Sequence, residues 1–222
     1  MDNFSIGKSD PGEEIQNIFN SKRQEIELRL NEFREIWKKG TKKEIFAELV
    51  FCILTPQANG KLCWSAVENM IRKGVLFEGE RIQIVKELSS ARFIHKKSAY
   101  IVEAREKFFL DSKVSLKSII SQIGDGYKAR EWLVQNIKGI GYKEASHFLR
   151  NIGFEQNLAI LDRHIIKNLQ LVGIIKEITG SLSKGRYFDI EKRMMEFSKA
   201  VQIPMNYLDL VMWYKETGEI FK

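Results

Sequence analysis

The sequence predicts an all-α protein, because three features of the chain favour helices over strands. Apolar residues recur at helical intervals almost throughout its 222 residues. No stretch alternates convincingly with the period of two that is typical of a half-buried strand. The three prolines, Pro11, Pro56 and Pro204, each stand at a break or at a helix start, where the ring is tolerated.

Two of the expected helices show their role in the pattern of apolar residues. Glu13–Lys38 is amphipathic, and it is followed by Glu44–Leu54, which is apolar nearly all round and therefore predicts a buried central helix. The first twelve or so residues are polar and are expected to be frayed. The other expected helices, separated by short breaks, are Lys61–Arg72, Glu80–Leu88, Lys96–Phe108, Leu116–Ile123, Tyr127–Ile137, Glu144–Asn151, Arg163–Leu171, Phe188–Val201 and Asn206–Glu216.

Composition narrows the class of protein. A net charge of +7 and a pI of about 9.3 favour a polyanionic partner, although many basic proteins bind no nucleic acid. Two cysteines, Cys52 and Cys63, are too few for a disulfide framework or for a four-cysteine iron–sulfur site. The N-terminus has no apolar signal region and no apolar run is long enough for a membrane helix, so we expect an intracellular, cytoplasmic protein with no membrane contact.

The run Ile137-Lys138-Gly139-Ile140-Gly141 is the most informative turn, because it joins two expected helices. Glycine accepts positive φ and leaves backbone N–H groups uncovered, and the N-terminus of the following helix adds further donors and partial positive charge. Such a turn can bind a DNA phosphate without reading a base, with Lys138 adding a mobile charge. The alternative at this point is a tight helix–helix turn with no ligand.

Three stretches carry a resemblance to a known family: IKGIGYKEASHFLRN (137–151), AILDRHI (159–165) and LDLVMWYKETGEIFK (208–222). They resemble the helix–hairpin–helix DNA glycosylases, and within them the type-2 8-oxoguanine DNA glycosylase/AP lyases of archaea and bacteria. The resemblance runs from about residue 20 to the C-terminus. One departure is the loop Gly153–Leu161, which lacks the proline usual in the superfamily, while the hairpin, lysine and aspartate stay in register.

The resemblance implies that Lys143 and Asp162 are the catalytic residues. The Lys143 amine would attack C1′ of the damaged nucleotide and form a Schiff base, which requires that it first lose its proton. A helix N-terminus and a partly dry cleft favour the neutral amine, whereas a nearby Asp162 carboxylate favours the ammonium form. Asp162 would orient the lysine, shuttle its proton and stabilise charge on the sugar, and it is also a favoured N-cap for the helix beginning near Arg163. β-Elimination would follow, with no metal and no cofactor.

Base recognition is assigned by the resemblance to Trp213 and Lys222, whose terminal carboxylate would accept a hydrogen bond from the oxidised purine. His147 lies one helical turn after Lys143 and is a further candidate, unless it is a half-buried histidine bonded to a carbonyl. Asp209 is equally consistent with a contribution here, with helix capping or with a surface position.

The loop Thr55-Pro56-Gln57-Ala58-Asn59 resembles the turn that relatives of endonuclease III insert into the duplex when a nucleotide is flipped out. Gln57 and Asn59 are the wedge candidates, although a short polar loop with proline is often only a turn. The basic residues within Arg92–Lys97 and Arg105–Lys107 either extend the DNA contact or form solvated helix faces.

Taken with the helical pattern, the resemblance predicts two helical lobes around a DNA-binding cleft that carries the helix–hairpin–helix motif. The central lobe is expected over residues 41–153, and the second over 12–40 together with 154–222. The expected partner is double-stranded DNA containing 8-oxoguanine, and the expected enzyme is a monomer. Three alternatives stay open: a related glycosylase for another lesion, a non-catalytic hairpin module that binds DNA, and an α-helical interaction protein.

Overall fold

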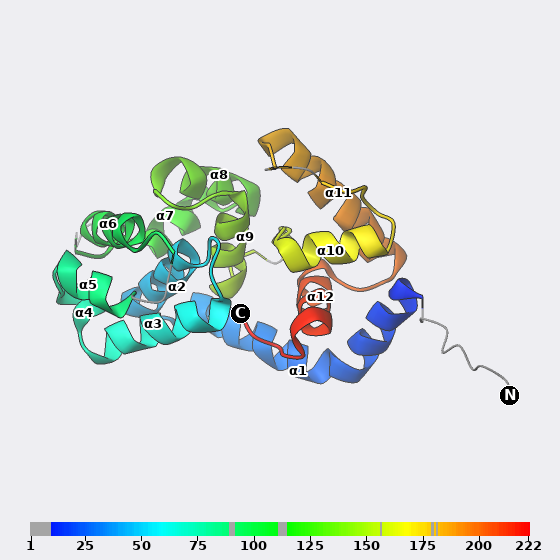
Figure 1. The fold of residues 1–222 in the computed structure, drawn as a ribbon, viewed down its shortest axis with the longest axis horizontal. Coiled ribbons are helices and arrows are strands. Elements are labelled where there is room, and N and C mark those ends of the chain that lie inside the picture. Colours follow the sequence, from blue (N-terminus) through cyan, green and yellow to red (C-terminus); the bar gives the residue numbers. More distant parts are fainter. Residues whose placement is uncertain (1–9, 89–91, 111–114, 156, 179, 181) are drawn as a thin grey trace, which may run out of the picture. The chain divides into compact units, whose positions relative to one another are not determined.

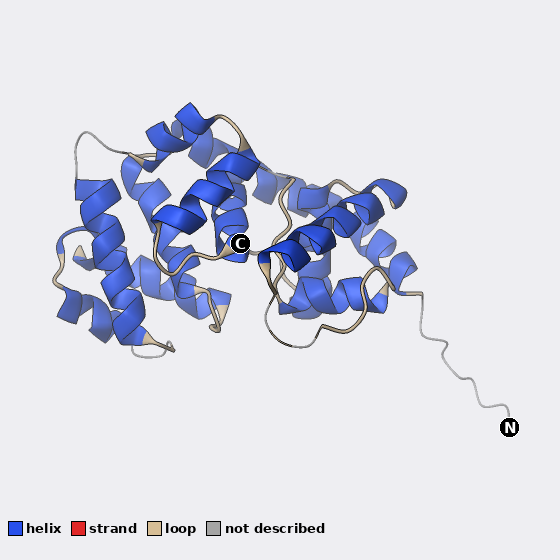
Figure 2. Cartoon of the chain, turned by 90° about the horizontal axis from the view of Figure 1, so that it is seen from above, coloured by secondary structure: helices blue, strands red, loops and turns tan. Residues whose placement is uncertain are grey.

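The computed structural model describes residues 10–222 except 89–91, 111–114, 156, 179 and 181. Residues 1–9, most of the segment expected to be frayed, lie outside this range. Every regular element in the described residues is a helix, which confirms the all-α prediction (Figure 2). The elements are α1 (Pro11–Lys39), α2 (Lys42–Leu54), α3 (Gly60–Arg72), α4 (Val75–Glu78), α5 (Arg81–Glu87), α6 (Ile94–Arg105), η1 (Glu106–Leu110), α7 (Leu116–Ile123), α8 (Gly126–Asn136), α9 (Tyr142–Asn151), α10 (Arg163–Leu171), α11 (Lys184–Ala200) and α12 (Met205–Thr217).

Each expected helix has a counterpart, and the structure adds one short element. The extra helix is α4, whose four residues are too few to produce a periodic pattern. A second difference concerns the helix expected to end at Phe108. Its last part is the π-helical turn η1, which follows α6 directly. None of the described helices combines the length and apolar character that crossing a bilayer requires.

The chain divides into two compact units. The central unit comprises Leu30–Ile160 and Lys222, and the second unit comprises the chain up to Arg29 and Leu161–Phe221. The division therefore falls inside α1 rather than after residue 40, and at residue 160 rather than 153.

Packing explains why the last turns of α1 belong to the central unit. The Trp37 ring packs on Phe154 at 4.8 Å, and the Arg150 guanidinium lies 4.9 Å from the centre of the Phe33 ring. Gly153, with φ of +72°, lets the backbones approach so closely that a Cβ there would lie 2.3 Å from the Phe33 carbonyl oxygen. These contacts tie residues after position 30 to α9 and to the loop that follows it.

The core of the central unit is α2, as its apolar sequence predicts. Every residue from Ile45 to Leu54 is buried, including Glu48. The helix packs against α3, α6, α7 and α9, which surround it in Figure 1. Its start is set by Thr41, whose hydroxyl accepts a hydrogen bond from the Glu44 amide while the Glu44 carboxylate accepts one from the Thr41 amide.

The second unit packs α10 and α11 against α12. The first part of α1 completes it, because the Phe19 ring meets Tyr207 edge-on at 5.8 Å and Glu14 pairs with Lys215 at 3.1 Å. Ile165 and Leu169 of α10, Met194 of α11 and Val211 of α12 are buried.

Candidate active site

The hairpin between α8 and α9 has the geometry that its glycines predict. Gly139 adopts φ of +83°, and a Cβ there would lie 2.6 Å from a carbon of the Tyr100 ring, so the turn accepts only glycine without strain. Ile137 and Ile140 are buried and anchor the turn. The Gly141 amide donates to the Glu144 carboxylate at 3.1 Å, and exposed Lys138 pairs with Glu103 at 2.9 Å.

Lys143 lies in the first turn of α9, directly after the hairpin. Its side chain is 21 % exposed, so the amine is partly shielded yet still reachable. The Nζ atom donates to the Thr55 hydroxyl at 3.4 Å and lies 3.9 Å from the Glu144 carboxylate. The Thr55 hydroxyl in turn donates to the Cys52 carbonyl at 3.0 Å, so its oxygen faces Lys143 as an acceptor.

Asp162 is the N-cap of α10, as its position before Arg163 predicts. Its Oδ1 accepts hydrogen bonds from the amides of His164, at 2.8 Å, and Ile165, at 2.9 Å. Within the described residues Oδ2 accepts no hydrogen bond. The cap therefore fixes the carboxylate and leaves one oxygen for chemistry.

Trp213 also belongs to the second unit, where its ring meets the His164 ring edge-on at 4.9 Å. His164 therefore donates its amide to Asp162 and packs its ring against Trp213. Asp209 is buried within α12, which excludes the surface position considered for it and a role in capping its own helix.

A buried charged cluster in the central unit holds Lys222, one of the predicted base-recognition residues. The Lys222 ammonium pairs with the Glu48 carboxylate and lies 3.5 Å from the centre of the Trp64 ring. Asn151 donates to the other Glu48 oxygen at 3.1 Å. Sequence reasoning did not find Glu48 or Trp64; the available signal was a carboxylate inside the otherwise apolar α2, where a charge needs a partner.

His147 is buried and packs edge-on against Phe51 at 5.4 Å. Burial, followed by the positive charges of Lys143 and Arg150, holds the pKa of His147 well below its usual range, against an opposing contribution from the Lys222 main chain. Neither ring nitrogen reaches hydrogen-bond geometry within the described residues.

Because the pKa of His147 is depressed on folding, its neutral ring contributes stability that is lost as pH falls from about 6.5 toward the folded pKa. In that window the loss approaches about 1.4 kcal/mol per pH unit. We expect His147→Gln to flatten the acid side of the stability profile, measured by urea unfolding between pH 7.5 and 5. Exposed His95→Gln is the control, and an equal flattening in both variants would contradict this cause.

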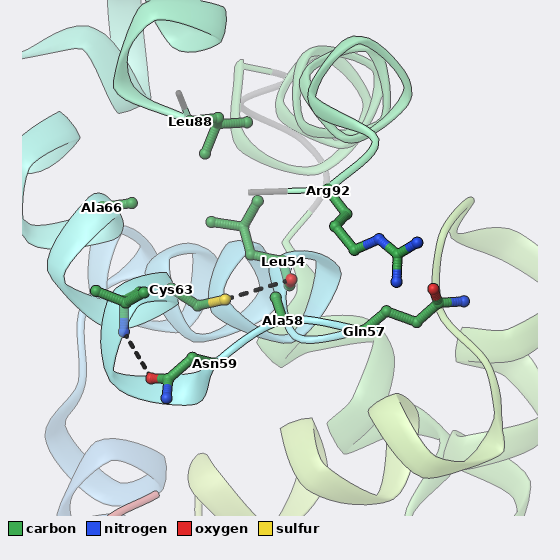
Figure 3. Close-up of a pocket in the computed structure, with 9 residues that line it drawn as sticks. Leu54, Gln57, Ala58, Asn59, Cys63, Ala66, Leu88 and Arg92 are labelled. Atoms are coloured by element: carbon green, nitrogen blue, oxygen red, sulfur yellow. Dashed lines mark hydrogen bonds between the residues drawn. The ribbon is translucent and has the colours of Figure 1, made fainter. Parts of the chain in front are cut away.

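The loop after α2 presents its two wedge candidates differently. Gln57 is exposed and holds φ of +53°, which is unusual for a residue with a side chain. Asn59 is the N-cap of α3, its side chain accepting from the Leu62 amide at 3.2 Å (Figure 3). These two residues line a pocket of about 180 Å³ together with Leu54, Ala58, Cys63 and Arg92. Capping occupies Asn59, which leaves Gln57 as the better wedge candidate.

Two of the basic residues considered for the DNA surface are buried instead. Lys97 is 4 % exposed and donates to the carbonyls of Leu54, at 2.7 Å, and Pro56, at 2.9 Å. Arg105 is 7 % exposed and lies 3.4 Å from the carbonyls of Val75 and Leu76. Both cations therefore bind main-chain carbonyls, and neither of the two alternatives, a DNA contact or a solvated helix face, describes them.

Comparison with known proteins places this geometry in context. A family model described as 8-oxoguanine DNA glycosylase, of the Ogg-HhH type, matches residues 26–203. A protein of Fusobacterium nucleatum named 8-oxoguanine DNA glycosylase/AP lyase is 44 % identical over 94 % of this chain and 96 % of its own length. A protein of the same name from Methanocaldococcus jannaschii is 38 % identical over 94 % and 97 %.

Two solved structures share the fold. The Methanocaldococcus jannaschii 8-oxoguanine glycosylase/lyase in complex with a 15mer DNA containing 8-oxoguanine has a TM-score of 0.86 and 35 % identity, covering 95 % of this chain and 99 % of that one. The 8-oxoguanine DNA glycosylase of Thermotoga maritima has a TM-score of 0.84 and 32 % identity, covering 95 % and 98 %.

Proposed function

This chain belongs to the 8-oxoguanine DNA glycosylase family, and from that premise we propose that it excises 8-oxoguanine from DNA and then cleaves the abasic strand. The observation that carries the proposal is Lys143, a partly exposed amine in the first turn of a helix that begins at a Gly-Ile-Gly hairpin. A nucleophile beside a phosphate-binding turn suits attack on a deoxyribose carbon.

The proposed reaction begins with extrusion of the damaged nucleotide, since a duplex hides the glycosidic carbon. The neutral Lys143 amine attacks C1′; the Nζ–C1′ bond forms as the bond from C1′ to the base breaks, and the base leaves with the electron pair and gains a proton. The attacking nitrogen then loses one proton, the C1′–O4′ bond breaks with O4′ keeping the electron pair and taking up a proton, and the C1′=Nζ bond forms to give the protonated Schiff base. Removal of a 2′ proton then expels the 3′ phosphate by β-elimination.

Asp162 is proposed to act through the oxygen that its cap leaves unused. A carboxylate held by two amides is kept in one orientation, from which it can accept the lysine proton and stabilise positive charge on the sugar.

For DNA binding we propose the hairpin Lys138–Gly141, with Gln57 as the wedge. The Gly141 amide already donates to Glu144, so a phosphate at this turn would compete with that carboxylate or bind neighbouring amides. The Lys138–Glu103 pair is exposed and weak, so it would exchange readily for a phosphate.

For base recognition we propose Lys222, His147 and Trp213. A buried histidine whose ring nitrogens lack hydrogen-bond partners within the described residues is a natural place for a ligand's donor or acceptor. We further propose that the enzyme acts as a monomer on chromosomal DNA inside the cell. We expect no iron–sulfur cluster, since such clusters take four cysteines and this chain has two.

The test is base release from duplexes that differ in one nucleotide: 8-oxoguanine, guanine, an alkylated purine or an oxidised pyrimidine. We expect free 8-oxoguanine by mass spectrometry, together with strand cleavage, and neither product from the guanine duplex. Release of a different lesion would reassign the substrate. Binding with no base release from any duplex would favour a non-catalytic hairpin module.

A further inference from the structure

Lys97 is an unusual lysine, because its ammonium is buried and is bound by carbonyl oxygens rather than a carboxylate. Lysine is almost never buried without a partner, since moving an ammonium out of water is costly. Burial lowers the pKa of Lys97, against opposing effects of Cys63 and Glu144. This unfavourable burial indicates that the Lys97 ammonium serves to hold the Leu54 and Pro56 carbonyls in place.

The two carbonyls that Lys97 binds lie on either side of Thr55. Leu54 is the last residue of α2, so its carbonyl accepts no hydrogen bond from an amide of the same helix. A cation at the C-terminal end of a helix also interacts favourably with the negative end of the helix dipole. Cys63 supports the same oxygen, with its Sγ at 3.3 Å (Figure 3). The Pro56 carbonyl is the second anchor, so the main chain is held immediately before and immediately after Thr55.

This short segment serves both functional elements of the central unit. Thr55 supplies the oxygen that faces the Lys143 amine at 3.4 Å. Gln57 follows Pro56 with φ of +53°, a conformation that persists only where the surrounding structure enforces it. Movement of the segment would displace the partner of Lys143 and relax the turn that presents Gln57.

We propose that Lys97 is a positioning residue of the glycosylase: by clamping the Leu54 and Pro56 carbonyls, it sets Thr55 against the Lys143 amine and fixes the turn that carries Gln57. The inference rests on the proposed function, because it concerns the geometry of the same nucleophile. It assigns Lys97 no contact with DNA.

Lys97→Met tests the clamp, since methionine keeps much of the side-chain volume and removes every donor. We expect single-turnover excision of 8-oxoguanine, and borohydride trapping on an abasic duplex, to slow about tenfold to a hundredfold, which is the usual effect of a misplaced reacting group. Binding to undamaged duplex should stay close to that of the wild type. Combining Lys97→Met with Thr55→Val should slow trapping little more than Lys97→Met alone, because both changes act through one contact.

Arg105→Met is the matched control, because Arg105 is a second buried cation of α6 that binds carbonyls away from the loop. It should lower the melting temperature but leave the trapping rate near that of the wild type. Equal slowing by Arg105→Met and Lys97→Met would show that the effect is general destabilisation and would overturn the proposal. A wild-type rate in Lys97→Met would also overturn it.

If Lys97→Met does not fold, Lys97→Gln, which keeps one donor group, is measured instead, and a wild-type rate there overturns the proposal. An inactive wild type would refute the proposed function itself.

Discussion

Lys143→Gln is expected to abolish covalent trapping and to lower both base release and strand cleavage by at least about a thousandfold, since glutamine offers no nucleophilic amine. Glutamine is as good a helix former as lysine, so α9 and the hairpin should keep their structure. Affinity for the damaged duplex should stay close to that of the wild type. The measurement is sodium borohydride trapping on a duplex with one 8-oxoguanine, alongside a gel-shift titration.

The control for this variant is Lys128→Gln, which removes one exposed lysine from α8 on the other side of the hairpin. This variant should form the covalent adduct at the wild-type rate, apart from any loss of DNA affinity caused by its lower net charge. If Lys143→Gln still formed the adduct, another amine would be the nucleophile. A folded, binding-competent variant that retained full base release without an adduct would point to water as the nucleophile.

Asp162→Asn is expected to separate the structural role of this carboxylate from its chemical role. Asparagine is as good an N-cap as aspartate, so its side-chain oxygen can keep the bonds to the His164 and Ile165 amides. Its amide nitrogen replaces the second oxygen, which can then neither accept the lysine proton nor stabilise positive charge. Base release should therefore fall roughly a hundredfold or more with little change in stability.

Asp162→Ala provides the comparison, since it removes the cap and the carboxylate together. It should cost about 1 kcal/mol of unfolding free energy in addition to the loss of activity. Single-turnover excision measures the loss of activity in both variants, and urea denaturation measures their loss of unfolding free energy. Wild-type activity in Asp162→Asn would restrict Asp162 to helix capping.

The hairpin before Lys143 could be predicted from the sequence, because its geometry depends on residues that are adjacent in the chain. Glycine at 139 predicts the positive φ, the isoleucines predict the anchors, and the lysine follows in the first turn of α9. The chemistry assigned to Lys143 came from a family resemblance, which the comparisons support. Nothing in the local pattern would have distinguished this lysine from a solvated one.

The burial of two basic residues of α6 could not be predicted from the sequence. Lys97 and Arg105 stand among charged neighbours in a helix with little amphipathic pattern, which predicts a DNA contact or a solvated helix face. Their carbonyl partners lie at the end of α2, in the loop after it and in the four-residue helix α4, and no local pattern links these positions to α6. Burial of a cation is a property of what packs around it, so only the assembled unit could place it.

Every α-helix of the described residues except α4, together with the hairpin turn and the Asp162 cap, could be predicted from the sequence, because each arises from hydrogen bonds and side-chain periodicity among residues a few positions apart. The partners of the functional side chains could not be predicted in this way, because they come together only when the helices pack. Lys97 reaches the Leu54 carbonyl across 43 positions, Lys143 reaches Thr55 across 88, and Lys222 reaches Glu48 across 174. Such pairings depend on how the helices stack, and stacking is set by the whole buried surface rather than by any local pattern.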